Sequence, residues 1–218
     1  DIKSENKQPC WQMRNHLREF LIATSQQGCS ENRNGGNMPS TYAHYRMGQE
    51  VYHNLTGKPK QIIEKYKELY DIGLHGPDIL FYDMLKPKVT ETGIAMHKEC
   101  AAPFFERGMT LVRTTHDEKL LAYLLGFGCH YLLDSACHPF VYEMAERNVI
   151  SHTLLEKEFD RTLMLETHKD PYHYYPACGI VPRVTYARVI HRAIPRIRTK
   201  EIICLLYTSP SPRDRTRS

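Results

Sequence analysis

The 218-residue sequence predicts an all-α fold, a bundle of several helices. Two observations carry this prediction. Apolar residues recur at spacings of three and four in several segments, which is typical of one face of a helix. No segment alternates convincingly between apolar and polar residues, so we expect no sheet. The length fits one domain with a sizeable core.

Start and stop signals divide the chain into separate helices. In chain order, we expect helices over residues 42–55, 61–70, 96–106, 117–137, 151–165 and 184–194. Pro59 opens the second helix and Gly73 closes it, because proline favours the first turn and glycine the helix end. The third follows Gly93, and Ser151 is a good N-cap for the fifth. The fourth helix has the clearest apolar face, formed by Leu120, Leu121, Leu124, Leu125 and Leu132.

The two ends of the chain differ from its middle. Residues 1–37 finish in a polar, Gly/Asn-rich stretch, and the Gly35-Gly36 pair just before Met38 can be encoded by a ribosome-binding sequence. We therefore expect residues 1–37 to be a translated leader, with Met38 as the start. Residues 205–218 are of low complexity and resemble an artefactual tail. The domain is accordingly expected over 38–204, with its natural C-terminus missing.

The composition narrows the class of protein. Twelve histidines is a high count for this length and the first sign of metal chemistry. The formal net charge of +4 lies mostly near the ends. The middle of the chain has no basic stripe, so we expect no stable nucleic-acid partner. Seven cysteines at irregular spacing, without a CxxC pair, fit a reducing compartment. The apolar stretches are too short for a transmembrane segment and no signal peptide is seen, so we expect a cytoplasmic protein.

The strongest local signal is a pair of helical motifs that join a histidine to a carboxylate. His130 and Asp134 are four residues apart, as are His152 and Glu156, so each pair lies on one helix face. His138 lies between the pairs, and the following proline predicts that it ends its helix. Imidazole and carboxylate together are ordinary zinc ligands.

Two alternatives follow from the same residues. A buried hydrogen bond between His130 and Asp134 needs no metal, although burying such groups is costly unless they are paired or metal-bound. A non-catalytic, zinc-stabilised helical domain is the second alternative. Structural zinc sites are usually closed and often rich in cysteine, whereas the positions singled out here are histidines and carboxylates, which favours catalysis.

At this point the sequence resembles the zinc-dependent phospholipases C, a superfamily that also contains fungal single-strand nucleases. The resemblance covers about residues 38–165 and is closest to bacterial phospholipase C-like proteins. Eight positions of the right chemistry occur in the family's order: His44, Asp78, His97, His130, Asp134, His138, His152 and Glu156. The resemblance implies an all-α, multi-helix bundle around a buried multi-zinc cluster.

The family pattern also implies how two or three zinc ions are shared among these residues. One zinc would be held by His97, His130 and Asp134, with Asp78 close to it. His138, His152 and Glu156 would hold the second. The third would be held by His44 and the bridging Asp134, helped in the family by the terminal amine of an N-terminal Trp. Pro39, once Met38 is removed, is our candidate for that terminal residue.

The implied activity is hydrolysis of a phosphodiester, in the manner of a phospholipase C. Zinc lowers the pKa of bound water to about 7, which supplies hydroxide for in-line attack at phosphorus. Asp78 would accept a proton or orient the nucleophile; without the family, Gly76-Pro77-Asp78 is ordinary turn chemistry. A phospholipid is favoured as substrate, because the nucleases carry Asp where this chain has Glu156.

Rival enzyme classes explain less of the sequence. A nuclease-type phosphodiesterase on the same metal cluster is the main alternative function. The dipeptide His116-Asp117 raises an HD-type phosphohydrolase, which leaves His138, His152 and Glu156 unexplained. A di-iron bundle would need Glu-x-x-His motifs at i, i+3, and the pairs here are i, i+4 with histidine first.

Overall fold

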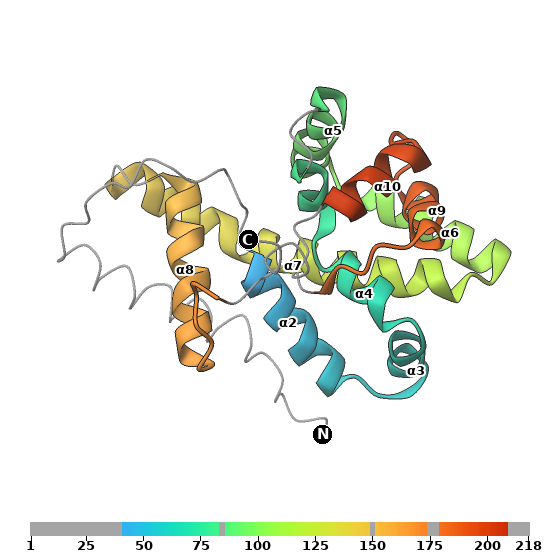
Figure 1. Ribbon diagram of the computed structural model, residues 1–218, viewed down its shortest axis with the longest axis horizontal. Coiled ribbons are helices and arrows are strands. Elements are labelled where there is room, and N and C mark those ends of the chain that lie inside the picture. The colour runs from blue at the N-terminus through green and yellow to red at the C-terminus, as the bar shows by residue number, and fades with distance from the viewer. Residues whose placement is uncertain (1–40, 83–85, 149–150, 174–178, 209–218) are drawn as a thin grey trace, which may run out of the picture. The chain divides into compact units, whose positions relative to one another are not determined.

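The computed structural model describes residues 41–82, 86–148, 151–173 and 179–208, and in these ranges it holds helices and no strand (Figure 1). The prediction of an all-α fold is therefore confirmed. The elements are α2 (Thr41–Asn54), α3 (Gly57–Lys65), α4 (Lys67–Gly73), the 3-10 helix η1 (Gly76–Phe81), α5 (Pro87–Lys98), α6 (Ala102–Thr115), α7 (Glu118–Asn148), α8 (His152–Glu166), α9 (Val184–Ala193) and α10 (Thr199–Thr208).

The chain forms two compact units. Among the described residues, the large unit comprises 44–131 and 179–208, and the small unit comprises 41–43 and 132–173. Helix α7 passes from the large unit into the small unit after Tyr131. The expected leader, residues 1–37, lies outside the described residues.

Two of the expected helices are interrupted. The one expected over 61–70 is divided into α3 and α4 by Tyr66, whose φ of −128° and ψ of 41° are not helical. The one expected over 96–106 is wrong, because α5 ends at Lys98 and α6 begins at Ala102. Pro103 lies in the first turn of α6, the one part of a helix that a proline tolerates without losing a backbone hydrogen bond.

Helix α7 begins as expected and ends later. The Asp117 carboxylate accepts hydrogen bonds from the backbone N–H groups of Lys119 and Leu120, at 3.0 and 3.1 Å, and so caps the helix. The helix then runs through Pro139 to Asn148, so the expectation that His138 ends it is wrong. A proline inside a helix removes its own N–H bond, crowds the carbonyl four residues earlier and disfavours helix at the preceding residue. These effects are local, and the residues after Pro139 continue the helix.

Helix α7 is both long and rich in apolar residues over most of its length. By length and composition alone its stretch Glu118–Glu143, which holds an 18-residue window with a mean hydropathy of 1.3, could cross a membrane. Half of that window is buried within the protein, as expected for the central helix of a helical domain. We expected every apolar stretch to be too short for a transmembrane segment, and the length of this stretch corrects that expectation.

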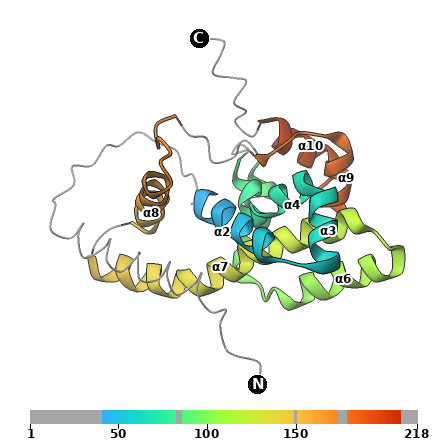
Figure 2. The same ribbon diagram turned by 90° about the horizontal axis from the view of Figure 1, so that it is seen from below.

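The core of the large unit joins segments from both ends of the described chain. Helices α9 and α10 pack against each other (Figure 1), and their apolar residues join those of α4, η1 and α7 in one cluster. Helix α6 doubles back along α7 (Figure 2), with the Phe104 ring centroid 4.5 Å from that of Phe127. Leu205 and Leu206 are each 1% exposed, so the packed helix α10 extends past the expected domain boundary at residue 204.

Candidate metal centre

Close contact between α4 and α7 brings the first predicted ligands together. Gly73 and Gly126 face each other, and a Cβ atom added to Gly126 would lie 2.1 Å from the carbonyl oxygen of Tyr70. The two backbones can approach this closely only because both residues lack a side chain. Two segments that carry predicted ligands, 76–78 after α4 and His130 on α7, are therefore held side by side.

Gly76 has a second role, next to the ring of His130. Its φ is +52°, which favours glycine, and an added Cβ would lie 2.3 Å from Cδ2 of His130. The chain then enters η1, where Asp78 is 5% exposed. The sequence reading of Gly76-Pro77-Asp78 as a turn is thus correct for the backbone, and the same turn buries the Asp78 carboxylate.

His130 is oriented by a backbone carbonyl. It is 2% exposed, and its Nδ1 lies 3.2 Å from the carbonyl oxygen of Leu74. A carbonyl oxygen only accepts, so Nδ1 carries the hydrogen and Nε2 presents its lone pair. A histidine that binds a metal almost always donates its other N–H in this way.

Three predicted ligands meet in the buried part of the large unit. Donor atoms of His44, Asp78 and His130 all lie within 4.8 Å of one another, and all three residues are buried. The rings of His44 and His130 are stacked, with centroids 4.0 Å apart and an interplanar angle of 17°. The geometry therefore brings two imidazole rings and one carboxylate together in a single buried place.

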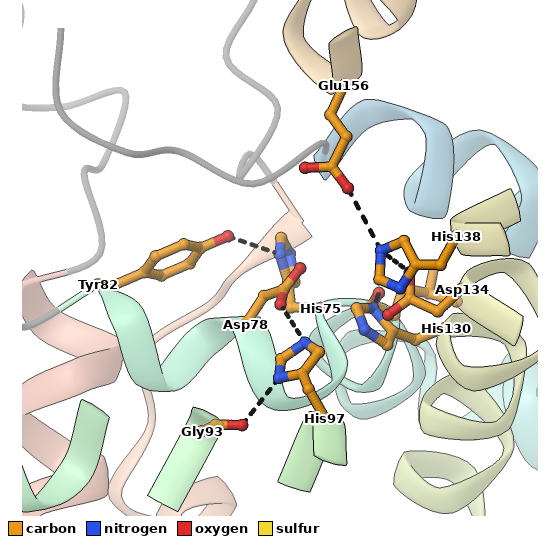
Figure 3. A network of polar contacts seen from close by, with 10 residues as sticks. His75, Asp78, Tyr82, Gly93, His97, His130, Asp134, His138 and Glu156 are labelled. Carbon is orange, nitrogen blue, oxygen red and sulfur yellow. Dashed lines mark hydrogen bonds and ion pairs between the residues drawn. The ribbon is translucent and has the colours of Figure 1, made fainter. Parts of the chain in front are cut away.

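His97 approaches the same carboxylate from α5 (Figure 3). Its Nδ1 donates to the carbonyl oxygen of Gly93 at 2.8 Å, and its Nε2 lies 2.9 Å from Oδ1 of Asp78. With Nδ1 carrying a hydrogen, Nε2 and the carboxylate require a shared proton or a shared cation between them. Two ligand atoms on a tetrahedral zinc with bonds of about 2.0–2.1 Å lie roughly 3.3 Å apart, so the observed pair is close to that spacing.

The sequence analysis assigned no role to His75, which is 3% exposed. Its Nδ1 lies 3.0 Å from the hydroxyl of Tyr82 (Figure 3). Burial lowers the pKa of His75 to about 3, with Asp78 opposing that shift and two neighbouring histidines adding to it. His75 is therefore neutral at pH 7. The signal for it was its position between the apolar residues Ile72 and Leu74 and the turn Gly76-Pro77-Asp78.

A second group of predicted ligands lies in the small unit (Figure 3). Nε2 of His138 is 3.3 Å from Oε1 of Glu156 and 3.8 Å from Oδ1 of Asp134. The side chains are partly open to solvent, 25% exposed for His138 and 18% for each carboxylate. Asp134 follows His130 by one turn of α7. His152 is the first residue of α8; its side chain and Pro39 lie outside the described residues.

The donor sets suit zinc. Each combines imidazole nitrogen with carboxylate oxygen, and zinc takes both at nearly the same bond length. In the large unit His44, Asp78 and His130 are also buried, where ionised or polar groups are costly unless they are paired or coordinate a metal. The eight predicted ligand positions themselves remain a prediction.

Comparison with known proteins yields one finding. A family model described as zinc-dependent phospholipase C matches residues 43–197, a range that includes every predicted ligand from His44 to Glu156. No curated protein and no solved structure matches the chain.

Proposed function

This chain belongs to the zinc-dependent phospholipase C family, and on that premise we propose that it is a phospholipase C-like phosphodiesterase. The observation that carries the proposal is the buried meeting of His44, Asp78 and His130 within 4.8 Å. It lies inside the range that the family matches, and its chemistry is that of a zinc site.

The proposed ligands form two groups that share α7. In the large unit, His44, Asp78, His97 and His130 would hold zinc. In the small unit, Asp134, His138, His152 and Glu156 would hold a further ion, with Asp134 one helical turn from His130. Zinc bound there would supply a Lewis acid for phosphoryl oxygens and lower the pKa of a bound water to about 7.

The protein's own groups have separate roles in this proposal. The Asp78 carboxylate accepts or orients a proton of the attacking water, the usual task of a general base. His97 is oriented by the Gly93 carbonyl, which accepts from its Nδ1, so that its Nε2 faces Asp78 and the same ion. His75 is neutral and buried beside them, so it adds no positive charge that would repel a cation.

For the substrate, we propose a phospholipid-type phosphodiester over single-stranded nucleic acid. Binding a polyanion depends on neutralising several phosphates with Lys and Arg. The net charge of the chain is only +4, mostly near its ends, which gives little support for that mode. Glu156 in place of the nucleases' Asp supports the same choice.

The test combines metal content with a substrate panel. Purified protein is assayed on phosphatidylcholine vesicles and on single-stranded DNA, before and after a chelator removes metal. We expect zinc in the protein, cleavage of the phospholipid, and loss of that cleavage with the chelator. His53→Ala provides a control, because this histidine is exposed near the other end of α2 and should change nothing. Zinc-dependent cleavage of DNA alone would make the protein a nuclease, and a zinc-free protein would end the proposal.

A further inference from the structure

A buried carboxylate caps the helix that carries His44. Asp160 lies on α8 and is 7% exposed. Its Oδ2 accepts a hydrogen bond from the backbone N–H of Tyr42, and its Oδ1 accepts one from that of Ala43, both at 2.9 Å. These donors belong to the first turn of α2, which has no helical partners for its N–H groups.

The two hydrogen bonds to the Asp160 carboxylate form a strong tether between α8 and the first turn of α2. Hydrogen bonds to an ionised acceptor are about twice as strong as neutral ones, and a carboxylate at a helix N-terminus also gains from the macrodipole. A second contact joins the same two helices, since the hydroxyls of Tyr42 and Thr167 are 2.6 Å apart. Thr167 is the C-cap of α8, so α8 holds the first turn of α2 at two points.

The tether lies next to predicted ligands on both helices. His44 directly follows Ala43, and Asp160 follows Glu156 by one helical turn. His44 is stacked on His130 with ring centroids 4.0 Å apart, so a small rotation of the start of α2 would displace its donor atom. An ordinary N-cap could come from a neighbouring residue, whereas this one lies 117 positions from Ala43.

We propose that Asp160 is a positioning residue that holds the first turn of α2 and thereby aims His44 at its zinc. This role rests on the proposed function, because it requires His44 to be a zinc ligand. Asp160 itself binds no metal in this assignment. Groups that orient metal ligands typically contribute about 10–100-fold to metal affinity or activity.

The test is a double-mutant cycle on zinc affinity, measured by competition with a chromophoric chelator. It compares the wild type, Asp160→Asn, His44→Ala and the double variant. Asp160→Asn keeps the side-chain shape but places an amide N–H against one backbone donor. We expect it to weaken zinc binding about 10-fold when His44 is present and to have no further effect in His44→Ala. Glu158→Gln is the control on the same helix, since Glu158 pairs with the exposed Arg161.

The outcomes distinguish the positioning role of Asp160 from the ligand role of His44. An equal loss of zinc affinity with and without His44, or no loss in either background, would overturn the positioning role and leave Asp160 as a structural cap. If Asp160→Asn does not fold, Asp160→Glu replaces it in the cycle and should show a smaller loss with the same dependence on His44. Unchanged zinc affinity in His44→Ala alone would instead remove His44 from the proposed ligand set.

Discussion

Backbone groups orient two predicted ligands of the large unit, whereas three predicted ligands of the small unit contact one another through their side chains. In the large unit, backbone carbonyls of Leu74 and Gly93 orient His130 and His97, and Gly76 leaves room for the His130 ring. In the small unit, His138 contacts Asp134 and Glu156, and its ring centroid lies 5.6 Å from that of Tyr142. The side chains of His138, Asp134 and Glu156 are all partly exposed.

This difference indicates two ways of building a metal site. Donors fixed by packing and carbonyl bonds are arranged before metal arrives, so binding orders little of the chain. Donors on exposed helix faces gain their arrangement mainly from the ion that joins them, and metal binding then contributes to folding. The large-unit donors should therefore tolerate metal removal in place, while the small-unit donors should become mobile.

The largest expected effect is that of His130→Ala. It removes a buried ligand and its bond to Leu74, so zinc should no longer stabilise the large unit. With free zinc about 1,000-fold above its dissociation constant, the lost stabilisation is about 4 kcal/mol. Thermal unfolding with and without zinc measures it. Zinc that still raises the unfolding temperature of His130→Ala as much as that of the wild type would contradict this expectation.

The next effect is on turnover. Asp78→Asn keeps the size of the side chain but weakens it as a proton acceptor, so phosphodiesterase kcat should fall about 10²-fold or more. Zinc content is measured on the same samples to separate chemistry from metal loss. An Asp78→Asn variant with wild-type kcat would return Asp78 to the role of a turn residue.

A glycine pair isolates how much the packing around His130 matters. Gly76→Ala should cost about 3 kcal/mol, from the left-handed backbone and from overpacking against the His130 ring. Gly57→Ala is the matched control, because Gly57 has φ of +70° and no atom within 4 Å of an added Cβ, and should cost about 1 kcal/mol. Chemical denaturation measures both. Equal losses of unfolding free energy in the two variants would mean that the His130 ring moves aside at no measurable cost.

The smallest expected effect is on the stability of zinc-free protein when a predicted ligand of the small unit is changed. Glu156→Gln should change the unfolding free energy of zinc-free protein by no more than about 1 kcal/mol, since partly exposed ion pairs contribute little. The same change should weaken zinc binding clearly. A large stability loss in the zinc-free variant would show that this group, too, is held by the protein rather than by metal.

Much of this architecture could be predicted from local pattern. The apolar spacing of α7 and the Ser151 cap of α8, whose Oγ accepts from the Leu154 N–H at 3.3 Å, both appear as expected. Pro103 marked the start of α6 and was overlooked inside an expected helix. Pro139 was read as a helix end, because its local preference carries no information about the packing that continues α7.

The site was predictable only where its residues recur at helical spacing or match a family. His130 with Asp134, and His152 with Glu156, have the four-residue period of a helix face. The buried His75 and the Asp160 tether have no such period, since both depend on segments that meet only after folding. Gly76 likewise reads as a turn residue, and its contact with His130 becomes visible only when α4 packs on α7.

The most direct test of the account is a crystal structure of zinc-loaded protein, with anomalous diffraction recorded on both sides of the zinc absorption edge. The account predicts an anomalous peak bonded to His44, Asp78 and His130, at about 2.0–2.2 Å from their nitrogen and oxygen donors. Zinc peaks only elsewhere, with these three side chains bound to no metal, would contradict it.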